Sequence, residues 1–258
     1  MKEFLLKLYN WPFLPEAQAN EYQKIIRDTE WEGIKPYFKK GKMLDVGCGT
    51  GYSLLRAKKE FDVEAYGIDP EPMRHGVHGA ENELDTIEIK AGMAEALPYA
   101  DAMFDVLYSS HVLEHVENKP KALQEMARVL KPDGVLIIGM PTHHMARIRM
   151  VSNYLFLTHI NIVNTLFKGL INTSKTYWWE IFAPRSHSYP LSKTVFADIR
   201  DYNPKKWSEL LQGYFSIEQV ILPAYYSFPE YRQLVKLKKN AKKSSSVFFI
   251  CRQKPITQ

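Results

Sequence analysis

One run of residues, MLDVGCGTG at 43–51, has the composition of a loop that holds a nucleotide-like ligand. Asp45 lies in an apolar segment, and three glycines then follow at alternate positions: Gly47, Gly49 and Gly51. Because glycine has no Cβ, the backbone can turn tightly there and pass close to a ligand. A helix-forming segment over 52–59 follows at once, so its first N–H groups can face that ligand. The run predicts a strand, a binding loop and a helix.

A second carboxylate follows the glycine run at a distance of eighteen residues. Asp69 ends another apolar segment, in the sequence GIDP at 67–70. A carboxylate at the end of the second strand of such a fold accepts hydrogen bonds from a ribose diol. The dinucleotide fingerprint G-x-G-x-x-G does not apply, because its last glycine would fall at Tyr52. We therefore expect a ribose-bearing ligand held by a different glycine spacing.

The chain resembles the class I S-adenosylmethionine-dependent methyltransferases, in particular the ubiquinone-type and small-molecule subgroup. After the glycine run and Asp69, four further segments match that family in the right order: 94–98, 104–106, 111–116 and 128–134. The resemblance covers residues 40–141. It implies S-adenosylmethionine as the cofactor and methyl transfer as the reaction.

The resemblance also implies a set of cofactor-binding residues: Asp45, Gly47, Cys48, Gly49, Gly51, Asp69, Pro70, Met93, Ala94 and Ser110. Asp69 would bind the ribose hydroxyls, and Asp45 would act on the ammonium group directly or through water. The glycines would pass beneath the methionine part of the cofactor. Related sequences usually carry an aspartate at the position of Met93, which can only pack against adenine. Adenine recognition must then rest on packing and on backbone groups.

Histidine is the natural candidate for a base that removes a proton from a hydroxyl or amine acceptor. We name His111, just beyond the fourth predicted strand, and His144 as the candidate catalytic residues. Transfer by positioning alone, without a base, is the alternative. Residues 111–115 also fit the zinc pattern H-x-x-E-H, which would need both histidines on one helix face. The surrounding methyltransferase pattern argues against zinc, so we expect no metal.

The order of predicted elements indicates an α/β fold. Strands are expected over 43–46, 64–68, 86–90, 104–109, 134–140, 215–222 and 246–252, with helices between most of them. Such alternation favours parallel strands in a doubly wound, Rossmann-like sheet. The resemblance implies seven strands with the last antiparallel. We expect a single domain over 1–258, divided into four parts: an N-terminal helical cap (1–40), the cofactor-binding core (41–142), a lid insertion (143–190) and the rest of the sheet (191–258).

The insertion over 143–190 is too long for a simple connection and follows the fifth strand. Ile160, Val163 and Phe167 have helical spacing, and aromatic residues cluster over 177–182. Three interpretations stay open: a helical and aromatic lid over the acceptor, a surface that contacts a membrane, or ordinary packing.

Charge divides the chain into two unlike parts. Residues 1–142 hold 17 Lys and Arg against 23 Asp and Glu, whereas residues 143–258 hold 17 against 6. The basic second part suggests an anionic partner. With two distant cysteines and no apolar run of membrane-spanning length, we expect a cytoplasmic protein, with peripheral membrane contact as an option.

These observations predict a methyltransferase that acts on a small-molecule or lipid-like, anionic acceptor, with transfer to oxygen. A nucleic-acid methyltransferase is the first alternative, although the chain shows no separate nucleic-acid-binding domain. A non-catalytic protein that binds S-adenosylmethionine as a scaffold is the second. The sequence predicts neither the identity of the acceptor nor the oligomeric state.

Overall fold

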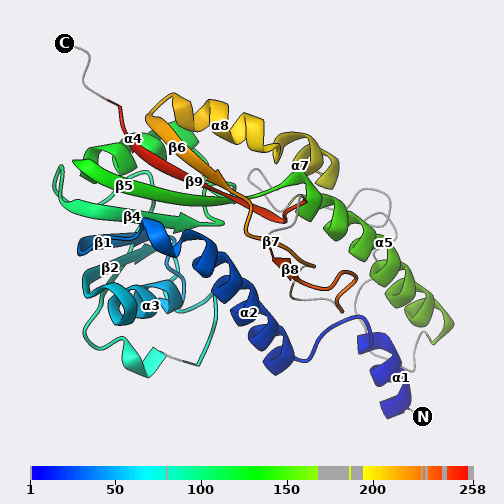
Figure 1. Ribbon diagram of the computed structural model, residues 1–258. Helices are drawn as coiled ribbons and strands as arrows, with labels where there is room; N and C mark the ends of the chain where they lie inside the picture. Colours follow the sequence, from blue (N-terminus) through cyan, green and yellow to red (C-terminus); the bar gives the residue numbers. More distant parts are fainter. Residues whose placement is uncertain are drawn as a thin grey trace.

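A seven-stranded sheet forms the centre of the molecule (Figure 1). The computed structural model describes residues 2–79, 81–167, 186, 194–227, 229, 232–239 and 243–254. The strand order is β3-β2-β1-β4-β5-β9-β6. The strands are β1 Gly41–Val46, β2 Val63–Asp69, β3 Glu88–Ala91, β4 Phe104–Ser110, β5 Leu130–Pro141, β6 Phe215–Ile221 and β9 Ser246–Gln253. Two short strands, β7 Ala224–Tyr225 and β8 Lys238–Lys239, pair separately.

The pairing pattern confirms the predicted doubly wound sheet with an antiparallel last strand. The strands from β3 to β5 pair in parallel, while β9 runs antiparallel to both β5 and β6. Because the first five strands are parallel, β1, β2 and β4 end at the same edge of the sheet. The reversal of strand order between β1 and β4 leaves a crevice at that edge, where such sheets bind ligands.

Helices cover both faces of the sheet (Figure 1). They are α1 Lys2–Asn10, α2 Glu16–Ile34, α3 Tyr52–Phe61, α4 Lys119–Val129, α5 His143–Leu166, α7 Val195–Asp201 and α8 Pro204–Gln212, with short 3₁₀ turns at Lys35–Tyr37 and Glu81–Glu83. Local residues fix several starts. Asn118 and Asn203 each accept a backbone hydrogen bond in the first turn of α4 and α8, and each is followed by a proline in that turn.

The core has two layers because successive residues of a strand face opposite sides. On one face, Leu107 packs in a cluster with residues of α4 and α8, including Leu123 and Leu211. On the other face, Val106 packs in a cluster with residues of α2 and α3, including Ile34 and Leu54. A parallel sheet needs both faces covered, so these two layers hold the binding edge in place.

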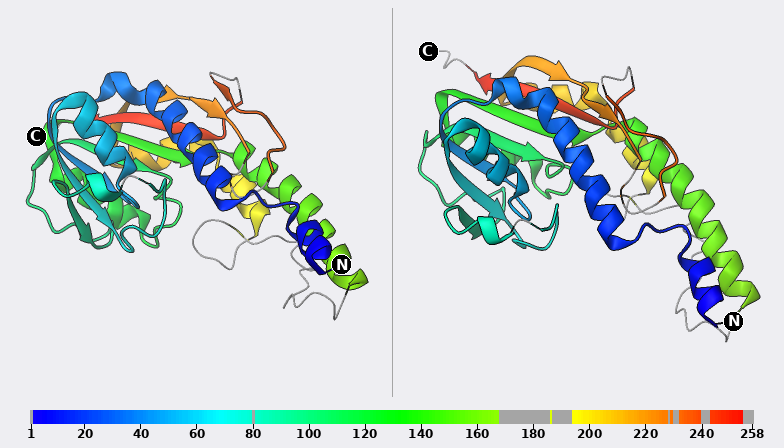
Figure 2. Two further views of the ribbon diagram at one scale, coloured as in Figure 1. Left: turned by 90° about the horizontal axis from the view of Figure 1, so that it is seen from below. Right: turned by 60° about the horizontal axis from the view of Figure 1, so that its bottom comes forward.

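The predicted insertion begins with a long helix. α5 occupies 143–166, and the rest of the expected lid, including the aromatic cluster at 177–182, lies outside the described residues. α1 packs against the far end of α5 (Figure 2), where Leu5 and Val163 share a cluster and a ring nitrogen of His159 lies 2.7 Å from the Leu8 carbonyl oxygen. Within the described part of the chain, no helix combines the length and apolar character needed to cross a membrane.

Candidate active site

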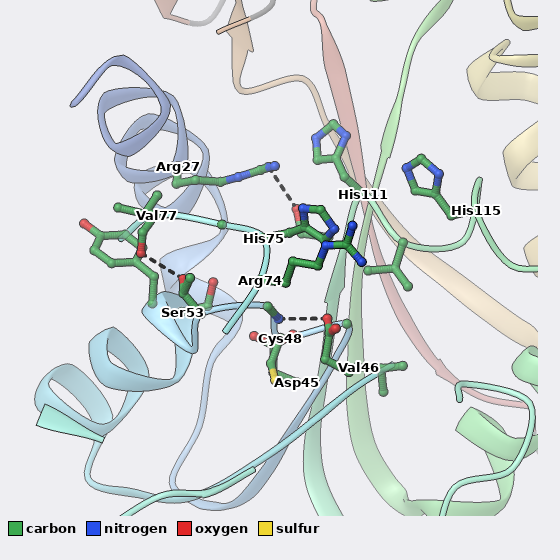
Figure 3. A pocket seen from close by; sticks show the side chains of 18 of the residues that line it. Arg27, Asp45, Val46, Cys48, Ser53, Arg74, His75, Val77, His111 and His115 are labelled. Carbon is green, nitrogen blue, oxygen red and sulfur yellow. Dashed lines mark hydrogen bonds between the residues drawn. The ribbon is translucent and has the colours of Figure 1, made fainter. Parts of the chain in front are cut away.

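A pocket of about 730 Å³ opens where β1, β2 and β4 end (Figure 3). Most residues that the sequence assigned to cofactor binding or catalysis line it: Asp45, Gly47, Cys48, Gly49, Asp69, Pro70, Met93, Ala94, Ser110 and His111. Gly51 and His144 do not line it. The fold thus brings four separate segments of the sequence to one site.

The glycine loop has a conformation that other residues could not adopt. Gly47 has a φ of 81°, and a Cβ there would lie 2.1 Å from Cγ2 of Val112. Gly49 has a φ of 52°, and its Cβ would lie 2.1 Å from the carbonyl oxygen of His75. Gly51, with a φ of 76°, starts α3 and so directs that helix toward the site. The bare backbone leaves room for a ligand against the loop.

Replacing Gly47 with alanine is expected to lower the free energy of unfolding by about 2–3 kcal/mol, from positive-φ strain and the clash with Val112. Urea unfolding measures this loss. Adding Val112→Ala should restore part of it, because the clash disappears while the strain remains. Gly79→Ala is the control, since Gly79 has a φ of 109° and no atom would lie within 4 Å of its Cβ. Equal losses for Gly47→Ala and Gly79→Ala would show that the clash contributes nothing.

Two carboxylates flank the loop. Asp69 accepts backbone hydrogen bonds from Gly49 (2.9 Å to Oδ2) and from Glu71 (2.8 Å to Oδ1), which fix its orientation. Each oxygen keeps a second lone pair that a ribose hydroxyl can use. Burial, followed by the nearby charge of Asp69, raises the pKa of Asp45 well above its usual value. A ligand ammonium beside Asp45 would offset both effects, so the pair suits a cofactor that carries a ribose and an ammonium group.

The segment after β2 folds over the glycine loop and is tied to α2. Thr50 donates from its backbone N–H to the His75 carbonyl (2.9 Å) and from its hydroxyl to the Val77 carbonyl (2.8 Å). Asn20 on α2 exchanges two hydrogen bonds with the backbone of His78, at 2.9 and 3.0 Å. The predicted N-terminal cap therefore forms one wall of the pocket.

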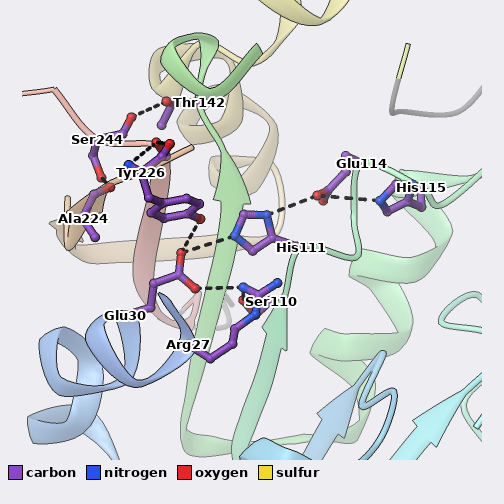
Figure 4. A network of polar contacts seen from close by, with 11 residues as sticks. Arg27, Glu30, Ser110, His111, Glu114, His115, Thr142, Ala224, Tyr226 and Ser244 are labelled. Atoms are coloured by element: carbon purple, nitrogen blue, oxygen red, sulfur yellow. Dashed lines mark hydrogen bonds and ion pairs between the residues drawn. The ribbon is translucent and has the colours of Figure 1, made fainter. Parts of the chain in front are cut away.

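Arg27, His111 and Tyr226 of the pocket lining belong to one polar network (Figure 4). Glu30, which is 1% exposed, accepts hydrogen bonds from the Arg27 guanidinium (2.8 Å) and the Tyr226 hydroxyl (2.7 Å). Nε2 of His111 lies 3.5 Å from Oε1 of Glu30, and its Nδ1 lies 3.6 Å from Oε1 of buried Glu114. Both ring nitrogens of His111 thus face carboxylates.

This setting favours the charged forms. Burial and the charge of Arg27 lower the pKa of His111, but hydrogen bonds with Glu114 and Glu30 outweigh them, and the net pKa is raised. Burial raises the pKa of Glu30, but Arg27 and then His111 bring it down to about 2. His111 therefore keeps its proton to a higher pH than a free histidine does, and it can act as a base only after losing that proton.

Stability should depend on pH through His111. Its folded pKa lies above the unfolded value, so its contribution is complete below pH 6.5 and is lost as the pH rises through the folded pKa. Urea unfolding between pH 6 and 9 is expected to show wild-type stability falling with a slope that His111→Asn reduces. Equal slopes for the two proteins would mean that the two carboxylates do not hold the charge on His111.

The sequence did not identify Arg27, Glu30 or Tyr226 as site residues. Arg27 reaches from α2 into the pocket (Figure 3), where its guanidinium lies 3.4 Å from the Ser110 hydroxyl. A signal for Glu30 was present, because it lies four residues from both Ile26 and Ile34 on the buried face of α2. A charged residue in such a stripe needs a buried partner. For Tyr226, local sequence offered no signal.

His115 lies at the end of this network, and His144, the second candidate catalytic histidine, lies apart from it. Residues 111–116 form turns, and His111 has a φ of 57°, so His111 and His115 do not share a helix face. Among the described residues, no group of three His, Cys, Asp or Glu side chains could hold a metal ion. His115 lines the pocket, 4.0 Å from Glu114. The His144 ring instead contacts the His143 ring at a tilt of 43°, with the centroids 4.1 Å apart.

The sheet order, the glycine loop and the paired carboxylates define a Rossmann-like protein that binds a nucleoside-bearing cofactor. Comparison with known families narrows the class, because residues 44–138 match the family described as Methyltransferase domain. Residues 44–138 thus form a methyltransferase domain of the class I S-adenosylmethionine-dependent type.

Curated relatives share the core but differ in their acceptors. An ajmaline N-methyltransferase of Rauvolfia serpentina is 34% identical over 42% of this chain and 38% of its own length. An O-methyltransferase of Aspergillus sclerotiorum is 34% identical over 38% of each protein. A tRNA U34 carboxymethyltransferase of Saccharophagus degradans is 31% identical over 43% of this chain and 36% of its own length. The chain thus spans well under half of these relatives, so similarity does not define its acceptor.

Solved structures share the fold over nearly the whole chain. A methyltransferase structure from Thermotoga maritima superposes with a TM-score of 0.53 at 18% identity, covering 91% of this chain and 95% of that one. This likeness supports the fold alone.

Proposed function

We propose that this protein transfers a methyl group from S-adenosylmethionine to a small-molecule or lipid-like, anionic acceptor, at an oxygen atom. The main support for this proposal is that one pocket is lined by the glycine loop, by Asp69 and by residues of the His111 network. The cofactor supplies an activated methyl group. The protein's task is then to orient two reactants and to handle one proton.

The residues present fit the cofactor. Gly47 and Gly49 leave backbone space that a Cβ would fill, and Cys48 lies between them. In this proposal Asp69 holds the ribose hydroxyls and Asp45 the ammonium group. Met93, which is 52% exposed and lines the pocket, packs against adenine together with Pro70 and Ala94, while Ser110 borders the methyl-transfer region.

His111 is the proposed base. It lines the pocket and belongs to the charged network, so a proton can enter or leave it beside the acceptor. The fraction of His111 that has lost its proton would accept the proton of the acceptor hydroxyl as the new carbon–oxygen bond forms. We give His144 no part in this step, because it does not line the pocket.

Support for an anionic or lipid-like acceptor comes from charge. The part of the chain beyond the core is strongly basic, and Arg74, His75 and His115 line the same pocket. Acids with hydroxyl or phenol groups, and lipid headgroups, are therefore the first acceptor classes to try.

Calorimetric titration with S-adenosylmethionine and S-adenosylhomocysteine tests the cofactor assignment, and we expect micromolar binding of both. Methyl-labelled cofactor then tests turnover on anionic hydroxyl compounds, lipid extracts, amines and total tRNA. Label on an oxygen of an anionic or lipid-like acceptor supports the proposal. Label on tRNA or only on amines overturns the acceptor class, and binding without turnover on any acceptor favours the scaffold alternative.

A further inference from the structure

Helix α5 carries its polar and apolar residues on unexpected faces. It buries Ser152, Asn153, Asn161 and Asn164, of which Asn161 is 0% exposed. Its exposed positions instead include five large apolar or aromatic residues: Val151, Tyr154, Leu155, Ile162 and Leu166. The buried side of α5 also holds seven apolar residues, so the helix is apolar on both sides, whereas a helix facing water usually exposes polar residues. The exposed face of α5 is therefore suited to an apolar environment rather than to water.

The five exposed residues form one stripe, interrupted by the half-buried Thr158 between Leu155 and Ile162. Tyr154 and Leu155 follow Val151 by three and four residues, and Ile162 and Leu166 follow Leu155 by seven and eleven. This spacing places all five along one side of the helix. The stripe from 151 to 166 extends about 22 Å at 1.5 Å per residue. Leu166, at the far end, is 70% exposed. A single exposed leucine needs no explanation, but a stripe of this length does.

Helix α1, which packs against α5, and the turn that follows it also expose apolar residues. Phe4, Leu6 and Trp11 are exposed, and Phe4 is 67% exposed. Trp11 packs edge-on against Phe156 of α5, with 6.2 Å between ring centroids. Figures 1 and 2 show α1 beside the end of α5, away from the sheet. We call these eight residues the α1–α5 surface: Phe4, Leu6, Trp11, Val151, Tyr154, Leu155, Ile162 and Leu166.

Positive charge adjoins the α1–α5 surface. The Arg232 guanidinium lies over the Trp11 ring, 5.2 Å from its centroid, and donates a hydrogen bond to the Trp11 carbonyl. Exposed Lys236, Lys238 and Lys239 follow within a few residues. α5 itself contains the exposed Arg147 and no Asp or Glu, whereas its Arg149 is paired with Asp198; the acidic Glu3 of α1 is paired with Lys7.

We propose that the α1–α5 surface docks onto an anionic lipid bilayer. Apolar and aromatic side chains bordered by arginine and lysine are the composition that binds in the headgroup region, where the apolar residues leave water and the basic residues meet lipid phosphate. Trp11, with Arg232 over its ring, also suits the headgroup region, because both side chains have an apolar part and a polar part. The inference goes beyond the proposed methyl transfer and does not depend on it.

The position of α5 connects the membrane with the pocket. Met145, in the first turn of α5, lines the pocket, and Val151 lies six residues farther along the same helix. This separation corresponds to about 9 Å along the helix axis. One helix therefore links the lining of the pocket to the docked surface.

Vesicle flotation of the full chain tests the proposal. Vesicles of phosphatidylcholine alone are compared with vesicles that also contain phosphatidylglycerol, at low and high salt. We expect binding to the mixed vesicles, weakened by salt, and a loss of at least about tenfold in the partition coefficient for Leu155→Asp with Ile162→Asp. The matched control is Ile25→Asp with Val220→Asp, which places two charges on exposed apolar residues elsewhere and should float like wild type.

Binding of S-adenosylhomocysteine, measured on each variant, separates a lost surface from a misfolded protein and from a failure of the methyl-transfer proposal. Absence of vesicle binding by the wild-type protein overturns the proposal, and so does equal binding by both double variants. Light scattering identifies another occupant. A dimer that Leu155→Asp with Ile162→Asp disperses would show that a second copy covers the surface, which also overturns bilayer docking.

Discussion

Replacing Asp69 with alanine is expected to weaken binding of S-adenosylmethionine about a hundredfold, since the variant loses charge-assisted hydrogen bonds to two ribose hydroxyls. The same carboxylate also holds the backbone N–H groups of Gly49 and Glu71. Its removal therefore loosens the glycine loop as well as the ribose contact. Calorimetric titration of the folded variant measures the change in Kd.

Two further variants make the Asp69 experiment specific. Asp69→Asn keeps one acceptor oxygen and should fall between wild type and Asp69→Ala. Asp133→Ala removes an exposed carboxylate that contacts Lys39 at the surface, and it should leave cofactor affinity unchanged. Unchanged affinity in Asp69→Ala would show that the ribose is held elsewhere.

Replacing His111 with asparagine is expected to lower kcat by at least about a hundredfold, the usual loss when a general base is removed. Asparagine is chosen because it tolerates the positive φ of this position better than most residues. Cofactor affinity should change little, because the cofactor contacts assigned here come from other residues. His144→Asn is the matched control, and full activity is expected for it. If His111→Asn keeps wild-type kcat, transfer proceeds by positioning alone.

The pH profile of turnover should carry the signature of the network. Because the pKa of His111 is raised, activity is expected to increase with pH across a range above 6.5, as His111 loses its proton. Glu30→Gln removes one of the two carboxylates that hold the charge and should move this increase to lower pH. If activity increases over the same pH range in Glu30→Gln as in wild type, another group limits the reaction.

Local sequence predicted the sheet well, and most of the residues that it assigned to the cofactor line one pocket. The apolar segments ending at Asp45 and Asp69 are strands, and the predicted antiparallel strand near the C-terminus is β9. In each of these segments an apolar strand is followed closely by glycine or a carboxylate. A few consecutive residues are therefore enough to predict both the strand and the binding residue. The observed strand boundaries differ from the predicted ones by a few residues; β5, for example, starts at Leu130 rather than at 134.

The acceptor half of the site depends on contacts between residues that lie far apart in the sequence. Glu30, His111 and Tyr226 come from three segments separated by more than eighty residues, and only the folded sheet brings them together. The raised pKa of His111 follows from its two carboxylate partners, Glu30 and Glu114, so no short stretch of sequence could predict it. The lid interpretation of 143–190 stays a prediction beyond α5.

The place of β9 between β5 and β6 has a consequence for how the chain folds as it is made. β5 ends at Pro141, and its antiparallel partner begins only at Ser246. At ribosomal rates this interval of about 100 residues takes roughly 5–20 s, during which the nascent sheet exposes one edge of its longest strand. We therefore expect the sheet to close only late in synthesis, and chaperones that shield unpaired strands to raise the yield of folded protein.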